Sequence, residues 1–177
     1  MILDSKADVI MGCGNPMYDD DGNPSTESSY KYVGGEATWN GLMAGLTDFD
    51  GDGDGVPDNS VEDADGDGMV DAWVLIQELE DFQALMNGPT PKRVIGVPKV
   101  YQTLQYNRSS LAEGGQGEYS GAAGEPYSDP FVPGVPTLEE MTNAALNILD
   151  NDPDGFFLMI EGGAIDWASH GNSSYPS

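Results

Sequence analysis

Three residues near the carboxyl end of the chain could together hold metal ions. Glu161 follows the apolar run 156–160, and Asp166 and His170 come after it, four residues apart. Residues at i and i+4 share one face of a helix, and zinc accepts a carboxylate and an imidazole in that arrangement. Glu161 offers only oxygen, which favours a harder ion such as magnesium. The spacing therefore predicts a site for divalent cations; the alternative is that Asp166 caps a helix and His170 is a surface residue.

A second group of carboxylates lies in the segment 48–71, which holds ten of the 31 acidic residues and no Lys, Arg or His. Two blocks in it have the pattern D-x-D-x-D-G-x-x-D, and the second repeats the first after 13 residues. Alternating carboxylates in a tight loop supply the oxygens that calcium requires, and the Gly after the third Asp permits the sharp turn. We therefore expect a pair of calcium loops with the ligands Asp50, Asp52, Asp54, Asp58, Asp63, Asp65, Asp67 and Asp71.

These loops are not full EF-hands, because the position of the bidentate Glu is taken by Val61 in one and Val74 in the other. They resemble instead the short calcium loops of thrombospondin type 3 repeats. The alternative is a solvated acidic loop that binds no ion.

Composition excludes several classes of protein. The chain has 177 residues with 31 Asp and Glu against 6 Lys and Arg, which gives a net charge of −25. That charge repels phosphate backbones and anionic lipids, so binding of nucleic acid by a basic face and binding to an acidic membrane are both excluded. No apolar run approaches the roughly 20 residues that span a bilayer. Cys13 is the single cysteine, so neither an intrachain disulfide nor a cysteine zinc cluster can form.

The elements that must position these residues alternate between strand and helix. We expect strands at 7–11, 93–97 and 156–160, and helices at 36–46, 72–87 and 137–149. Strand and helix in alternation predict an α/β fold, with a mostly parallel sheet flanked by helices. Ligands of such sheets bind at the carboxyl ends of the strands, which is where Glu161 stands.

Helical spacing supports each of the predicted helices. In 36–46, Trp39, Leu42, Met43 and Leu46 recur at that spacing. In 72–87 the apolar residues fall on one face behind Asp71 as N-cap, and Gly88 with Pro89 ends the segment. The third begins with a capping box formed by Thr137 and Glu140. Its predicted buried stripe consists of Met141, Ala144, Ala145, Ile148 and Leu149.

Four segments resemble the alkaline phosphatase family. The run 156–172, F-F-L-M-I-E-G-G-A-I-D-W-A-S-H-G-N, is similar to the metal-binding segment of these enzymes, and the segments 136–149, 7–16 and 91–97 fit the family in the same order. The specific part is the motif Glu-x4-Asp-x3-His. The resemblance covers most of the chain outside the acidic insert and the Gly- and Pro-rich stretch 100–136.

The resemblance implies hydrolysis of phosphate monoesters with two zinc ions and one magnesium. It assigns Glu161 to magnesium and the pair Asp166 and His170 to the first zinc. The nucleophilic Ser or Thr of the family is expected upstream of residue 7 and is not Ser5, which lies beside the wrong strand. The remaining zinc ligands are expected beyond residue 177, so the chain resembles an internal fragment that is inactive by itself.

The expected organisation has five parts: 1–47, partial core; 48–71, acidic insert; 72–99, core helix and strand; 100–136, loop or lid; and 137–177, core helix, strand and metal-binding segment. The family resemblance implies a homodimer, small phosphomonoester substrates and a periplasmic or extracellular location. Two alternatives stay open. One is a phosphodiesterase, sulfatase or phosphomutase of the same superfamily, and the other is a secreted calcium-binding module.

Overall fold

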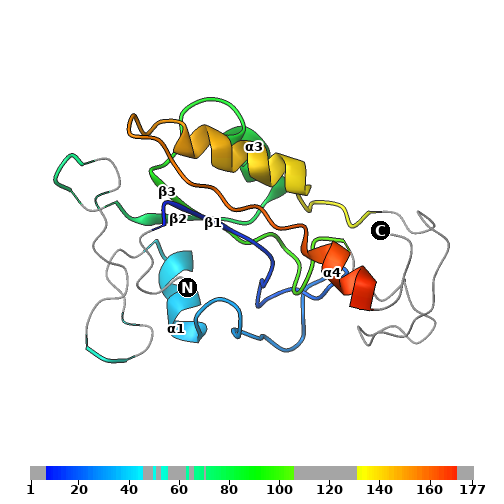
Figure 1. Cartoon of the computed structure of the whole chain (residues 1–177). Helices are drawn as coiled ribbons and strands as arrows, with labels where there is room; N and C mark the ends of the chain where they lie inside the picture. Colours follow the sequence, from blue (N-terminus) through cyan, green and yellow to red (C-terminus); the bar gives the residue numbers. More distant parts are fainter. Residues whose placement is uncertain are drawn as a thin grey trace.

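Three short parallel strands form the sheet around which the described part of the chain folds. The computed structural model describes residues 7–45, 71–105 and 131–170, together with 50, 53–55, 63 and 66–69. Its elements in chain order are β1 (Val9–Met11), α1 (Glu36–Met43), β2 (Trp73–Ile76), α2 (Leu79–Leu85), β3 (Arg93–Gly96), α3 (Leu138–Leu149) and α4 (Gly163–His170) (Figure 1).

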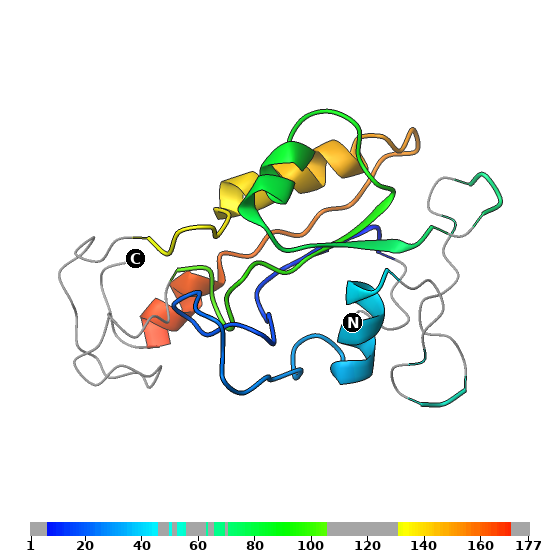
Figure 2. The same cartoon turned by 180° about the vertical axis from the view of Figure 1, so that it is seen from behind.

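The strand order is β1-β3-β2, and both pairings are parallel. Every residue of the central strand β3 is buried. Helices α2 and α3 cover one face of the sheet and α1 covers the other, as the two opposite views show (Figures 1 and 2). The predicted α/β fold with a parallel sheet flanked by helices is therefore confirmed.

Each face of the sheet has its own hydrophobic cluster. On the α1 face, Trp39 and Leu42 of the helix pack with Ile95 of β3. On the other face, Phe82 of α2 packs with Val94 of β3 and with the apolar stripe of α3. Alternate residues of β3 thus point into opposite clusters, as the two-residue period of a strand requires.

One charged residue, Arg93, is fully buried at the start of β3. Its Nε donates to the carbonyl of Ala7 at 3.3 Å and its Nη1 to the carbonyl of Asp71 at 3.3 Å. Its Cζ also lies 3.9 Å from the centre of the Trp73 ring. A buried cation is tolerated only when its donors are satisfied, and these contacts also join the beginnings of all three strands.

Helix α3 begins as its sequence predicts. The Thr137 hydroxyl accepts from the backbone N–H of Glu140 at 3.1 Å, and the Glu140 carboxylate accepts from the N–H of Thr137 at 2.8 Å. The five residues of the predicted stripe are the buried residues of the helix. Both the capping box and the buried face are confirmed.

The predicted helix 72–87 is wrong in its first half. Trp73–Ile76 is a strand paired with β3, and the helix occupies only Leu79–Leu85, with Glu78 rather than Asp71 at its N-cap. A four-residue apolar run has no period that separates a buried strand from a helix. Its short length and its aromatic and branched residues favour a strand. Pairing with the buried strand β3 determines the outcome. Gly88 still follows the end of the helix, with φ of 101°.

The predicted strand 156–160 is also absent. The segment is extended but pairs with no described strand, and Phe157 and Met159 are 90% and 76% exposed. An apolar run becomes a strand only when a strand edge pairs with it, and no such pairing is made here.

Smaller differences concern the first two elements. Strand β1 occupies only Val9–Met11 of the predicted 7–11, and it is half-buried because it lies at the edge of the sheet. Helix α1 ends at Met43, which is 55% exposed, and Leu46 lies outside the described residues.

The two described ends of the Gly- and Pro-rich stretch 100–136 pack against each other. Val100, Val132 and Val135 form a third cluster of buried side chains. The Gln105 amide donates to the carbonyl of Val132 at 3.2 Å and accepts from its N–H at 2.8 Å. The predicted loop or lid itself, residues 106–130, lies outside the described residues.

No helix in the described part of the chain is long and apolar enough to cross a membrane.

Candidate functional site

The carboxyl ends of the three strands are joined by one buried amide. Asn15, fully buried after β1, donates from Nδ2 to Oε1 of Gln77 at 2.9 Å and to the carbonyl of Val97 at 3.3 Å. Its Oδ1 accepts from the N–H of Met17 at 3.1 Å. Gln77 follows β2 and Val97 follows β3, so this side chain holds together the edge of the sheet at which α/β proteins bind ligands.

A cation lies at the same edge. Lys99, two residues after Val97, forms an ion pair with Glu78, and its Nζ lies 5.6 Å from the centre of the Tyr18 ring. The hydrogen bond to Glu78 raises the pKa of Lys99 above its usual value, so the lysine stays charged at neutral pH. Sequence reasoning missed Asn15, Glu78 and Lys99. The signal that could have found them is their position within four residues of the carboxyl ends of the strands.

The free thiol of Cys13 also belongs to this edge. It is half-buried against the third cluster, and burial, with a smaller effect of the Asp20 carboxylate, raises its pKa to about 12. The thiolate is the reactive form of cysteine, so Cys13 is neutral and unreactive at physiological pH.

The three predicted metal ligands lie on the last described segment. Glu161 precedes helix α4, Asp166 is in its first turn, and His170 is its last residue. Asp166 is inside the helix, so it is not the N-cap that the alternative interpretation required. The backbone positions of Asp166 and His170 are one helical turn apart, as predicted.

The chemistry of this donor set fits divalent metals. Glu161 and Asp166 are both exposed, so their carboxylates are accessible to an ion. Among the described side chains, which do not include that of His170, no three acidic, histidine or cysteine residues are gathered around one point. The structure thus places Glu161 and Asp166 on one short segment, and it brings them together with no further ligand among the described side chains.

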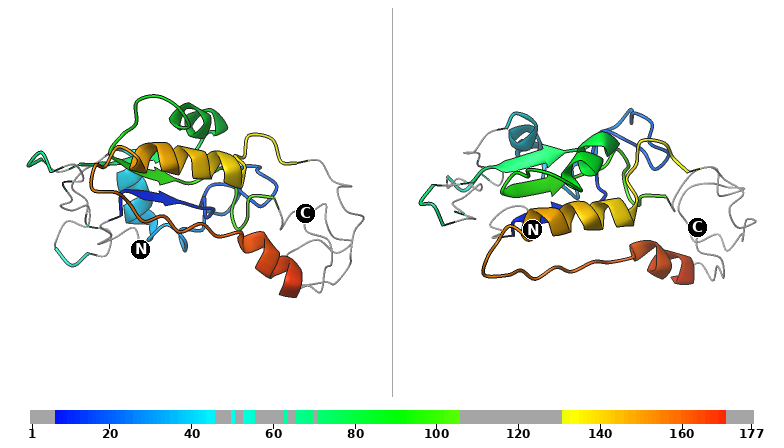
Figure 3. Two further views of the ribbon diagram at one scale, coloured as in Figure 1. Left: turned by 45° about the horizontal axis from the view of Figure 1, so that its top comes forward. Right: turned by 90° about the horizontal axis from the view of Figure 1, so that it is seen from above.

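Helix α4 lies toward the carboxyl ends of the strands. Figure 3 shows it beyond the end of the sheet toward which β1 points, and the segment 156–160 leads into it. The candidate ligands and the edge organised by Asn15 are therefore on the same side of the molecule.

The acidic insert is described only in part. Asp52, Asp58 and Asp65 lie outside the described residues, whereas Asp50, Asp54, Asp63, Asp67 and Asp71 lie within them. In both loops the first Asp accepts from the backbone N–H groups four and five residues later, which are Asp54 and Gly55 in one loop and Asp67 and Gly68 in the other. The sequence repeat therefore produces a repeated turn.

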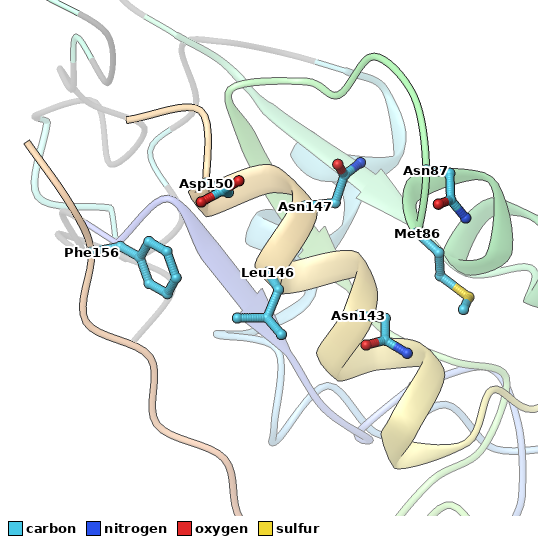
Figure 4. A pocket seen from close by; sticks show the side chains of 7 residues that line it. All are labelled: Met86, Asn87, Asn143, Leu146, Asn147, Asp150 and Phe156. Carbon is cyan, nitrogen blue, oxygen red and sulfur yellow. The ribbon is translucent and has the colours of Figure 1, made fainter. Parts of the chain in front are cut away.

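A separate surface groove of about 380 Å³ runs along α3. Figure 4 shows Asn143, Leu146, Asn147 and Asp150 lining it from the helix, with Phe156 on the neighbouring segment. The residues predicted to bind metals are not among those that line it.

Comparison with known proteins assigns the chain to a family. The model of the alkaline phosphatase family matches residues 75–177, which is more than half of the chain and includes the whole segment of Glu161, Asp166 and His170. The chain belongs to the alkaline phosphatase family. The predicted resemblance is confirmed.

Short regions of individual alkaline phosphatases are similar in sequence to this chain. Alkaline phosphatase 3 of Bacillus subtilis is 58% identical over 38 residues, covering 22% of this chain and 8% of the relative. Alkaline phosphatase H of Pseudomonas aeruginosa is 47% identical over 36 residues, covering 20% and 8%. The tissue-nonspecific alkaline phosphatase of Rattus norvegicus is 54% identical over 35 residues, covering 20% and 7%.

The aligned regions span less than a tenth of the length of these relatives. No solved structure gives a significant match to this chain.

Proposed function

We propose that this chain contributes part of a metal-dependent active site that hydrolyses phosphate monoesters. The observation that carries the proposal is the family match over 75–177, which contains Glu161, Asp166 and His170 in the spacing that the sequence predicts for metal ligands. The location of α4 toward the carboxyl ends of the strands agrees with it.

In this proposal Glu161 binds magnesium, and Asp166 and His170 bind one of two zinc ions. When bound, such ions supply positive charge to the phosphoryl oxygens and lower the pKa of water. The chain's own residues provide the ligands and fix their spacing, because α4 holds Asp166 and His170 one turn apart. Metal charge is needed here, since a protein with a net charge of −25 otherwise repels a phosphate ester.

The nucleophile is proposed to be a Ser or Thr outside residues 1–177. The mechanism would pass through a phosphorylated form of that residue. The chain by itself should therefore release no phosphate from an ester, and phosphatase activity of the purified chain that is lost in Asp166→Ala would refute this part of the proposal.

Binding of inorganic phosphate tests the proposal without requiring turnover. Calorimetric titration of the chain loaded with zinc and magnesium should show phosphate binding, whereas the metal-free chain should show none because its charge repels the anion. Asp166→Asn should weaken this binding at least about tenfold, and Asp150→Asn, an exposed acid outside the site, should not. Equal binding with and without metals, or no binding to the loaded chain, would contradict the proposal.

We also propose that the acidic insert binds calcium, because the two loops repeat both the spacing of their carboxylates and their turn hydrogen bonds. The ligands would be the eight Asp residues that the repeat predicts. This calcium site would be separate from the phosphatase site, so either proposal could be wrong without affecting the other.

Assembly and location are proposed from the family alone. We expect a homodimer, small phosphomonoester substrates, and a periplasmic or extracellular setting. A phosphodiesterase, sulfatase or phosphomutase would share the metal ligands and differ in the nucleophile, so the sequence around that residue distinguishes these enzymes.

A further inference from the structure

The groove along α3 is lined by side-chain oxygen atoms that accept no hydrogen bond. Asn143, Asn147 and Asp150 follow one another at helical spacing on the outer face of α3, and Asn87 joins them from the end of α2 (Figure 4). Within the described part of the chain, the carboxylate of Asp150 and the side-chain oxygens of the three asparagines have no hydrogen-bond or ion-pair partner. The groove therefore offers a set of acceptors to a ligand.

The amide of Asn147 has a fixed orientation. Its Nδ2 donates to the carbonyl of Leu85 at 2.8 Å and to the carbonyl of Gly88 at 3.1 Å. In Figure 4 this nitrogen lies on the side of α2, and the oxygen lies on the side of Asp150. Because the end of α2 holds the nitrogen, the atom that Asn147 presents to the groove is an acceptor. A ligand that fills the groove must therefore donate hydrogen bonds.

The carboxyl ends of α2 and α3 add negative potential at the same place. The two helices run in the same direction: Gln83 of α2 donates to Glu140 in the first turn of α3 at 2.8 Å, and Asn151 donates to Thr90 beyond both helices at 3.2 Å. Neither helix has a basic residue in its last turn, where Lys or Arg normally compensates the helix dipole. The helix ends therefore favour a cation in the groove.

Apolar side chains accompany these acceptors. Leu146 and Phe156, which are 38% and 45% exposed, also line the groove. A ligand with an aliphatic stem and a charged head can cover such a surface while its head meets the oxygen atoms. Arginine suits this arrangement best among the natural cations, because its planar guanidinium presents five donors and reaches several acceptors at once.

The charge of the whole chain indicates the kind of partner. A net charge of −25 repels a second copy of the same chain, whereas it attracts a basic segment from a distance. The volume of about 380 Å³ is near the lower end of the roughly 300–1,000 Å³ of small-molecule pockets. An open groove of this size along a helix fits one side chain of an extended peptide.

We propose that the outer face of α3 is a docking site for a basic segment of a partner protein, with one arginine side chain in the groove. The guanidinium would donate to Asp150, Asn143 and Asn147, and the aliphatic stem would pack on Leu146. The bond between Asn151 and Thr90 places this end of α3 near the start of β3, whereas the candidate metal ligands lie toward the carboxyl ends of the strands. The docking site is therefore separate from the proposed phosphatase site.

An NMR titration with a short peptide tests the proposal. The probe is an acetylated and amidated peptide with one arginine between glycines, added in 0.15 M NaCl so that long-range attraction is screened. The side-chain amide signals of Asn143 and Asn147 should shift and saturate. The same peptide with citrulline, which has a similar shape and no charge, should bind at least about tenfold more weakly. No saturable shift, or an equal response to citrulline, would overturn the proposal.

Three substitutions that each raise the net charge by one separate the groove from general attraction. Asn143→Lys places a cation among the acceptors and should weaken binding at least about tenfold. Asp150→Asn should weaken it about twofold to fivefold, as expected for an exposed ion pair. Asp154→Asn removes an exposed acid that does not line the groove, and it should change binding by less than about 1.5-fold. Equal effects of all three would indicate attraction by charge alone and would overturn the proposal.

Two further outcomes are distinguishable. Circular dichroism shows whether Asn143→Lys is folded, and if it is not, the comparison of Asp150→Asn with Asp154→Asn decides, because both change exposed side chains. Signals of the groove that shift with protein concentration in the absence of peptide would identify a second copy of the chain as the occupant, which would also overturn the proposal. No step of the test needs metal or a phosphate ester, so its failure is independent of the proposed phosphatase function.

Discussion

Asn15 is a residue on which the carboxyl edge of the sheet depends. Its side chain contacts the segments that follow β2 and β3, and it is fully buried. Amides in such positions fix the relative positions of strand ends, because removing one leaves several buried groups without a partner.

Asn15→Ala should lower the free energy of unfolding by about 1–3 kcal/mol, since it leaves the carbonyl of Val97 and the amide of Gln77 unsatisfied. Urea denaturation measures the change. Asn143→Ala is the matched control: Asn143 is half-buried on α3 and its side chain makes no hydrogen bond within the described part of the chain, so its replacement should change stability by less than about 0.5 kcal/mol. Equal effects of the two substitutions would contradict the role given to Asn15.

Cys13 should resist alkylation in the folded chain. Burial raises its pKa from 9.0 to about 12, so the reactive thiolate is scarce at pH 8, whereas the unfolded thiol ionises normally. Labelling with iodoacetamide should be at least about tenfold slower in buffer than in urea. The same shift means that unfolding releases a proton between pH 9 and 12, so the thiol's contribution to stability is present below pH 9 and is lost as the pH rises toward 12. Equal labelling rates would show that the thiol is not protected.

At the scale of elements, the packing of α2 on β3 depends on a glycine. A Cβ at Gly96 would lie 2.6 Å from Cε1 of Phe82 and 3.0 Å from Cγ of Met11. Phe82 is fully buried there, so neither ring nor strand has room to move.

Gly96→Ala should therefore destabilise the chain by about 1–3 kcal/mol through overpacking. Gly12→Ala provides the control, because Gly12 follows β1 and a Cβ there meets nothing within 4 Å. Thermal unfolding followed by circular dichroism compares the two variants. A Gly96→Ala protein as stable as Gly12→Ala would contradict this account of the packing.

The elements also show what a sequence can and cannot predict. The helix at 138–149 was predictable because local signals, the capping box and a clear apolar stripe, agree with its tertiary packing. The strand Trp73–Ile76 was not predictable, because four apolar residues show no period. Its strand conformation depends on pairing with β3. The segment 156–160 has a strand's composition, yet it pairs with no described strand, so composition alone did not determine its structure.

The residues of the candidate site also differ in whether the sequence alone could predict them. Glu161, Asp166 and His170 were found from spacing within one segment, which a linear sequence displays. Asn15, Glu78 and Lys99 come from three separated segments that only the parallel arrangement of strands brings to one edge.

At the scale of the whole molecule, the net charge of −25 is concentrated rather than spread. Ten acidic residues lie in the insert 48–71 without a compensating cation. Such a segment repels itself unless cations bind, so its stability should depend on the ions present.

Calcium should raise the melting temperature of the chain, and a calcium chelator should reverse the effect. At a calcium concentration a hundred times the dissociation constant, binding stabilises the folded state by about 2.7 kcal/mol. Asp63→Asn should reduce the shift, since Asp63 begins the second loop, whereas Asp150→Asn should leave it unchanged. No heat of calcium binding at low ionic strength, with melting unaffected by chelation, would show that the insert is a plain acidic loop.

The central claim is that the segment from Glu161 to His170 binds metal, and the single histidine of the chain allows a direct measurement. In NMR spectra recorded at pH 7 during zinc titration, the imidazole signals of His170 should shift as zinc binds. Asp166→Asn should weaken this binding at least about tenfold because it removes a ligand, and Asp150→Asn should not. The assignment of this site would be contradicted if the imidazole signals do not shift when zinc is added. It would also be contradicted if they shift at the same zinc concentrations in Asp166→Asn as in the unmodified chain.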